Sequence, residues 1–143
     1  MRFQEGEIQG VEVRYLKKHV DSRGWLMELY RLDELSPDRV PVLSTVSEIA
    51  PRTARGPYEH RSHGDYLCFL GPSPFEVALW DNRPDSPTFR CRQVVLCGEG
   101  LPCALVVPPG VVLSYRNRGD QPGWVFNFPN RFPAERSCGE QGE

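Results

Sequence analysis

Long apolar runs are missing from this sequence of 143 residues. Residues 1–7 contain no apolar stretch of the length that a signal peptide needs. No later segment approaches the roughly 20 apolar residues of a membrane-spanning helix. We therefore expect no membrane partner and, by default, a cytoplasmic protein. The length suits a single domain with a substantial core. We assign this domain to residues 1–133 and expect the polar tail, residues 134–143, to fray.

A surplus of basic charge is also missing. The formal net charge is -2, and Lys and Arg are scattered through both halves of the chain. A nucleic-acid-binding protein needs a basic patch or stripe that neutralises phosphates. The sequence therefore predicts no nucleic-acid partner and favours a small molecule or another protein.

Cys-x-x-Cys pairs are missing as well, although the chain has five cysteines. Their absence argues against a zinc ribbon, and the odd number argues against a complete disulfide framework. We expect reduced, mostly buried thiols, while Cys97 and Cys103 could form a bridge in an oxidising compartment. The cysteines are Cys68, Cys91, Cys97, Cys103 and Cys138.

Turn-forming residues, in contrast, are abundant. Fourteen prolines and thirteen glycines without a repeat fit many short strands and tight turns better than helices. About eight or nine strands separated by turn signals predict an all-β sandwich or barrel, and a jelly roll matches best. A short helical turn is expected at residues 33–37. The strands are expected at residues 10–16, 25–32, 42–49, 66–70, 75–80, 93–97, 103–107, 111–115 and 124–128.

Two of the three histidines lie in a polar cluster at residues 55–71. Gly56-Pro57 is a turn signal, so we expect a strand to begin directly after it. Imidazoles at the mouth of an apolar strand can transfer protons near neutral pH or bind a metal. His60 and His63 could equally form a structural pair that is hydrogen-bonded to Asp65 or Glu59.

Five segments carry a further signal: residues 21–28, Arg55-Gly56, the following strand up to Gly71, residues 85–89 and residues 108–112. Together they resemble the dTDP-4-dehydrorhamnose 3,5-epimerase family of cupins. The similarity runs from about Val11 to about Phe132. It implies a cupin-type jelly roll in one domain, a dTDP-sugar substrate, no cofactor and a homodimer.

The Asp-x-Arg-Gly-aromatic-x-x-Glu segment of that family crosses to the neighbouring subunit and contacts the nucleotide. The resemblance implies that Arg23 meets a phosphate, that Trp25 stacks near the thymine and that Glu28 accepts a hydrogen bond from the base or sugar. It also implies that Arg55 faces the nucleotide sugar. From the residues alone, the same segment could be a turn with Trp25 in the core and Arg23 solvated.

The sequence departs from the family at its catalytic positions. The family's catalytic histidine falls on Tyr58, and its second histidine falls on Leu113. The family's lysine falls close to Tyr66, and the tyrosine that serves as its general acid falls on Phe126. Proton abstraction next to a ketone needs a base and a group that stabilises the enolate. Leucine and phenylalanine supply neither, so other residues must act if the chain is an enzyme.

Arg-Gly-x-aromatic-x-His also resembles the nucleotide-sugar 3,4-ketoisomerases, which carry Arg-Gly-x-His-x-His. In that register His60 coincides with their second histidine and Tyr58 replaces the first. An isomerase needs one base that moves a proton between neighbouring carbons through an enediol. The sequence therefore predicts His60 or His63 as the base, with Tyr58 or Tyr66 as the acid.

Three classes of function remain open. The chain could be a cofactor-independent epimerase or isomerase, or a cupin that binds nucleotide sugars without turnover. It could also be a metal-dependent cupin in which His60, His63 and a carboxylate of Glu59 or Asp65 bind a divalent ion. We expect no metal, because cupin metal sites also need a distant histidine and Leu113 replaces it.

Overall fold

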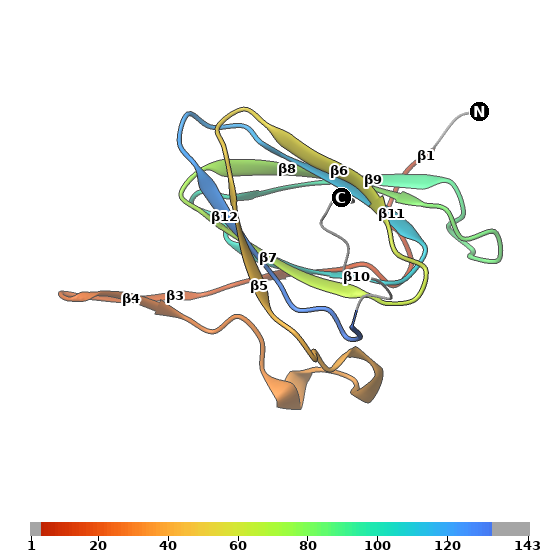
Figure 1. The fold of residues 1–143 in the computed structure, drawn as a ribbon, viewed down its shortest axis with the longest axis horizontal. Coiled ribbons are helices and arrows are strands. Elements are labelled where there is room, and N and C mark those ends of the chain that lie inside the picture. The colour runs from red at the N-terminus through yellow and green to blue at the C-terminus, as the bar shows by residue number, and fades with distance from the viewer. Residues whose placement is uncertain (1–3, 133–143) are drawn as a thin grey trace.

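Two five-stranded sheets face each other in the computed structural model of the protein, which describes residues 4–132 (Figure 1). The first has the order β1-β9-β8-β11-β6, and the second has the order β2-β10-β7-β12-β5. All neighbouring strands are antiparallel except β1 and β9. The strands of the two sheets are β1 (Gln4–Glu5), β2 (Glu12–Tyr15), β5 (Thr45–Ile49), β6 (Ala54–Glu59), β7 (Asp65–Gly71), β8 (Pro74–Asp81), β9 (Cys91–Gly98), β10 (Cys103–Val107), β11 (Val111–Asn117) and β12 (Gly123–Asn127).

A hairpin of two further strands extends sideways from the sandwich (Figure 1). It consists of β3 (Lys18–Asp21) and β4 (Gly24–Met27), joined by a turn in which the Asp21 carboxylate accepts the backbone N–H of Arg23. Two short 3-10 turns, η1 (Leu32–Glu34) and η2 (Pro37–Arg39), follow before β5.

The core lies between the two sheets and follows the alternation of their strands. In β8, Phe75, Val77 and Leu79 are buried while the residues between them are partly exposed. Leu67 and Phe69 of β7 face them from the other sheet and belong to the same cluster. Full burial of such a side chain stabilises the fold by about 1.5–3 kcal/mol. The predicted single jelly-roll domain with an all-β core is confirmed.

Most predicted strands are present, with shifted ends. The strand expected at 25–32 ends at Met27, and the one expected at 42–49 begins at Thr45. β1 and β3 were not predicted. Both are short and exposed, so they lack the alternation that identifies a half-buried strand.

The prediction that a strand begins after Gly56-Pro57 is wrong. β6 runs through this pair, with a cis peptide bond between the two residues and an irregularity in its pairing with β11 between Leu113 and Tyr115. Gly56 has φ +102°, which an L side chain rarely adopts. The turn signal therefore marks an irregularity inside an edge strand, where proline is tolerated.

Four of the cysteines are free thiols, and Cys68, Cys97 and Cys103 are buried. This agrees with the expectation of reduced, buried thiols, while Cys138 lies outside the described residues, as does the tail expected to fray. Within residues 4–132, no helix has the length and apolar character that crossing a membrane requires.

Candidate functional site

A small pocket opens between the sheets at the end where β6 passes into β7. The connection from His60 to Gly64 forms one wall, and residues of β10 and β11 form the other. The backbone fixes this connection, because Gly110 N–H donates to the His60 carbonyl (2.9 Å) and Gly64 N–H donates to Asn130 Oδ1 (2.8 Å). The lining residues are Tyr58, His60, His63, Asp65, Val107, Pro108, Val111 and Leu113.

Both histidines of the cluster converge on Asp65. His60 Nε2 lies 3.7 Å from Asp65 Oδ2, and His63 Nε2 lies 3.7 Å from Asp65 Oδ1. The two imidazole rings stack with centroids 4.2 Å apart. The His60 side chain is 41% exposed, whereas those of His63 and Asp65 are 7% and 5% exposed. His60 therefore faces the opening, and the other two residues form the floor.

Burial sets the protonation of the deeper histidine. It lowers the pKa of His63; the Asp65 carboxylate opposes this effect and His60 adds to it. His63 is therefore neutral near pH 7, with a lone pair on one ring nitrogen. A neutral imidazole can act as a base or a metal ligand.

The positions assigned to the family's two histidines border this same pocket. Tyr58 and Leu113 are direct Cα partners across β6 and β11, and both line the pocket. The Tyr58 ring lies parallel to the His60 ring, with centroids 6.3 Å apart. The two histidines of this chain therefore line the same pocket as the positions of the family's two histidines. They do so from residues 60 and 63 and not from residues 58 and 113.

Tyr66 does not lie in this pocket. Successive residues of a strand point to opposite faces, so Asp65 faces the interior and Tyr66 faces the outside of its sheet. The Tyr66 hydroxyl donates to the Leu29 carbonyl (2.7 Å), and its ring packs against Phe128. Burial raises the pKa of Tyr66 to about 12. Phe126 lies on the same outer face.

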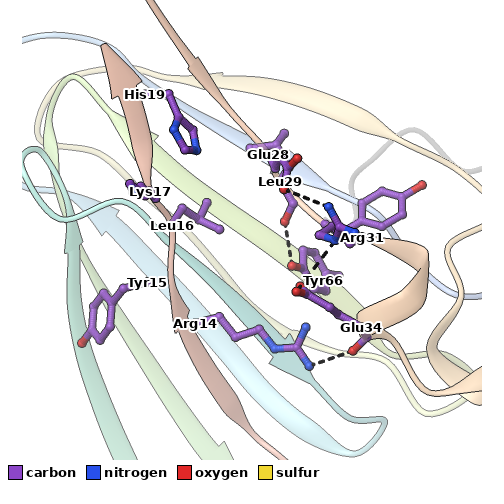
Figure 2. A pocket seen from close by; sticks show the side chains of 11 residues that line it. Arg14, Tyr15, Leu16, Lys17, His19, Glu28, Leu29, Arg31, Glu34 and Tyr66 are labelled. Atoms are coloured by element: carbon purple, nitrogen blue, oxygen red, sulfur yellow. Dashed lines mark hydrogen bonds and ion pairs between the residues drawn. The ribbon is translucent and has the colours of Figure 1, made fainter.

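Glu28 lies near Tyr66, in a second hollow on that outer face (Figure 2). The hollow lies between β2 and the segment that follows β4. Glu28 forms an ion pair with Arg31 at 3.6 Å, and Arg14 reaches the Glu34 carbonyl at 3.5 Å. Glu28 is thus separated from the histidines by the sheet.

The other residues assigned to nucleotide binding are solvent-exposed. Arg23 is paired only with Asp21 (2.8 Å) among the described residues, and Trp25 is 54% exposed, with Lys18 Nζ 4.8 Å from its ring centroid. The hairpin that carries both residues projects at one end of the sandwich, and the β6–β7 connection lies at the other end (Figure 1). Arg55 is exposed on β6. One copy of the chain therefore brings together Tyr58, His60 and His63 but not the predicted nucleotide contacts.

Sequence reasoning missed Asn127. Its Nδ2 donates to Asp65 Oδ1 (3.2 Å), and its Oδ1 is buried with no partner among the described residues. Strand alternation could have identified it, because Gly123 and Val125 are buried and residue 127 must share their face.

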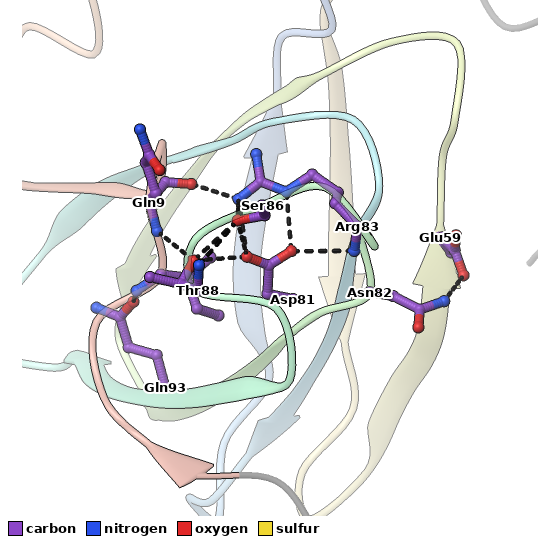
Figure 3. A network of polar contacts seen from close by, with 9 residues as sticks. Gln9, Glu59, Asp81, Asn82, Arg83, Ser86, Thr88 and Gln93 are labelled. Carbon is purple, nitrogen blue, oxygen red and sulfur yellow. Dashed lines mark hydrogen bonds and ion pairs between the residues drawn. The ribbon is translucent and has the colours of Figure 1, made fainter.

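A buried polar network fixes the loop that follows β8 (Figure 3). Asp81 is fully buried, and its carboxylate accepts hydrogen bonds from Arg83 Nε (2.8 Å), Ser86 Oγ (2.6 Å) and Thr88 Oγ1 (2.6 Å). Burial alone raises the pKa of Asp81, but these hydrogen bonds outweigh it and hold the pKa well below its usual range.

The same loop reaches the rim of the pocket through Asn82. Its Nδ2 donates to Glu59 Oε1 (3.2 Å), and Arg61 pairs with Glu59 from the other side (2.9 Å). Glu59 is thereby engaged at the rim and does not join the two histidines.

No family model matches the chain. Two curated relatives are similar over most of it. The spore coat polysaccharide biosynthesis protein SpsL of Bacillus subtilis (strain 168) is 35% identical over 121 residues, which cover 85% of this chain and 79% of that protein. The probable low-salt glycan biosynthesis epimerase Agl13 of Haloferax volcanii is 30% identical over 123 residues, covering 85% of this chain and 78% of that protein.

Solved structures share the fold. A dTDP sugar isomerase from Desulfovibrio desulfuricans G20 has a TM-score of 0.79 at 23% identity, covering 86% of this chain and 78% of that one. The rmlC epimerase of Mycobacterium tuberculosis has a TM-score of 0.74 at 21% identity, covering 93% and 69%. The curated relatives and this shared fold agree with the motifs of the sequence: the chain belongs to the dTDP-4-dehydrorhamnose 3,5-epimerase-like family of cupins.

Proposed function

We propose that the protein is an epimerase or isomerase of a dTDP-4-keto-6-deoxyhexose and moves protons at the carbons next to the ketone. The observation that carries the proposal is the pair of His60 with the buried Asp65 in a pocket at the mouth of the sandwich. Membership of the family supports the substrate class. Similar structures were solved with dTDP-quinovose and with dTDP-4-keto-L-rhamnose.

His60 is the proposed base, because it is the more exposed of the two histidines and opens toward solvent. It takes the proton from the carbon next to the ketone, and the electron pair of that C–H bond moves to the ketone oxygen. Asp65 stabilises the imidazolium that forms. The distance of 3.7 Å between His60 Nε2 and Asp65 Oδ2 is long for a hydrogen bond, but catalytic contacts of this kind shorten when substrate closes the site.

Tyr58 is the proposed acid. It lines the same pocket with its ring parallel to that of His60, and its hydroxyl returns a proton to the enolate from the other side. Return to the original carbon inverts its configuration, whereas protonation of the enediol at the neighbouring carbon moves the ketone. These steps move only protons, so they require no redox cofactor.

The nucleotide contacts are proposed to come from a second copy of the chain. Arg23 and Trp25 lie on a hairpin that projects from the sandwich and is far from the pocket of its own copy (Figure 1). From the second copy, Arg23 would pair with the diphosphate, Trp25 would stack near the base and Glu28 would accept a hydrogen bond from the base or sugar. Arg55 lies on β6, the strand that carries Tyr58, and would face the nucleotide sugar. The assembly is then a homodimer in which each pocket uses both copies.

Deuterium exchange tests this function. Chelator-treated protein is incubated with a dTDP-4-keto-6-deoxyhexose in D2O, and the product is followed by NMR. We expect deuterium at carbon 3, carbon 5 or both, with inverted configuration or a shifted ketone identifying the reaction. Binding of dTDP in calorimetry without any exchange would contradict an enzymatic role and favour a nucleotide-sugar-binding protein.

A further inference from the structure

The pocket floor lacks partners for several of its polar groups. Asp65 accepts one side-chain hydrogen bond, from Asn127, and among residues 4–132 neither a lysine nor an arginine pairs with it. His63 Nδ1 is buried without a partner in the same range, and so is Asn127 Oδ1. Buried carboxylates and imidazoles are normally hydrogen-bonded, paired or bound to a metal. Among these residues the Asp65 carboxylate has no cationic side chain beside it except the two histidines, so a bound cation would supply its missing partner, while His63 Nδ1 and Asn127 Oδ1 need a separate hydrogen-bonding group.

The geometry fits a metal ion. One ligand atom from each of His60, His63 and Asp65 lies within 4.8 Å of the other two. His60 Nε2 lies 3.7 Å from Asp65 Oδ2, and His63 Nε2 lies 3.7 Å from the other carboxylate oxygen, Oδ1. An ion with bonds of ~2.0–2.2 Å at tetrahedral angles holds its ligands ~3.3–3.6 Å apart. Small side-chain movements would bring the three atoms to this spacing.

We propose that His60, His63 and Asp65 form a binding site for a divalent transition metal ion, with Zn2+ as the best fit. Two imidazoles and one carboxylate are donors that zinc accepts readily, and such three-ligand sites leave one position for water or another ligand. The open position faces the mouth of the pocket, because His60 is the exposed member of the set.

This site goes beyond the proposed function, since proton transfer by His60 requires no metal. Of the two carboxylates that the sequence left open for a metal site, the geometry selects Asp65 and not Glu59, and the set contains no distant histidine because all three ligands come from residues 60–65. A bound ion would occupy the lone pair that His60 needs as a base. Metal binding and proton transfer would therefore exclude each other at this residue.

The test measures metal binding rather than turnover. Chelator-treated protein is titrated with ZnCl2 in a calorimeter, and with CoCl2 in an absorption spectrometer. We expect one ion per chain, with the visible cobalt bands of a four-coordinate nitrogen and oxygen site. His60→Asn and His63→Asn should each weaken Zn2+ binding ~100-fold or more, because even second-shell changes cost ~10–100-fold.

His19→Asn is the matched control, since it removes the remaining histidine, which lies on β3. It should leave zinc affinity unchanged, and melting curves would verify that all variants fold. The proposal is overturned by the absence of zinc binding, by affinity that survives both pocket substitutions, or by cobalt–sulfur absorption, which would assign the ion to cysteines. The deuterium exchange of chelator-treated protein tests the enzymatic function independently.

Discussion

His63 shows how burial adapts a single side chain at the floor of the pocket. It is 7% exposed, and its pKa is lowered by burial while Asp65 opposes the shift. In the unfolded chain the pKa of histidine is near 6.5. The unfolded state therefore binds more protons than the folded state between the lowered pKa and about pH 6.5, and stability must fall as the pH falls through this range.

The first prediction concerns this pH dependence. With both proteins chelator-treated, the free energy of unfolding of the unchanged protein should decrease from about pH 7 to pH 5 more steeply than that of His63→Gln, which has no imidazole to charge. Urea unfolding at a series of pH values measures both. Parallel curves for the two proteins would show that His63 is not buried in its neutral form.

At the scale of the element, β6 carries Arg55, Tyr58 and Glu59 past the pocket, and its course depends on Gly56. This glycine has φ +102°, and a Cβ at this position would lie 2.7 Å from the Leu113 carbonyl oxygen. Any larger residue would strain the backbone and push β6 away from β11. The irregular edge strand thus places Tyr58 beside His60.

The second prediction is that Gly56→Ala destabilises the protein by about 1–3 kcal/mol, the cost of a residue held in a sparsely populated conformation. Gly6→Ala is the control, since a Cβ there would meet only Cys91 Sγ at 3.9 Å and the residue has no positive φ. Denaturant titration compares the two. Equal stability of both variants would contradict the role assigned to Gly56.

The limits of sequence prediction also lie at this scale. Alternation identified β8, because its buried face leaves a clear pattern, whereas β10, which is buried along its whole length, and β11 were recognised as short apolar segments between Gly and Pro clusters. The same rule shows why Tyr66 was misplaced: a side chain adjacent to Asp65 must point to the other face. The sequence predicted the pair of His60 and His63. Alternation along β12 indicates that Asn127 faces the interior, but its contact with Asp65 is set by tertiary packing and could not be predicted.

At the scale of the whole molecule, the hairpin is the feature that one copy leaves unexplained. Val20, Trp25 and Leu26 are 70%, 54% and 63% exposed. Three large apolar side chains on one projecting hairpin favour contact with another surface. A second copy of the chain would cover them and deliver Arg23 and Trp25 to its pocket.

The third prediction is that the protein sediments as a dimer at micromolar concentration and that Val20→Ser combined with Leu26→Ser gives a monomer. Leu96→Ser is the matched control, because Leu96 is 60% exposed on β9, which belongs to the β1-β9-β8-β11-β6 sheet and not to the hairpin. The control should remain dimeric. A monomeric unchanged protein would rule out the pocket shared between copies.

The fourth prediction tests the central claim, that His60 is the base that moves protons on a nucleotide-linked keto sugar. We would compare the rate of deuterium exchange and the affinity for dTDP between the unchanged protein and His60→Asn, both chelator-treated. The account predicts that exchange falls by about 10²–10⁴-fold, while the Kd for dTDP changes less than about threefold. Exchange that persists in His60→Asn at the original rate would contradict it.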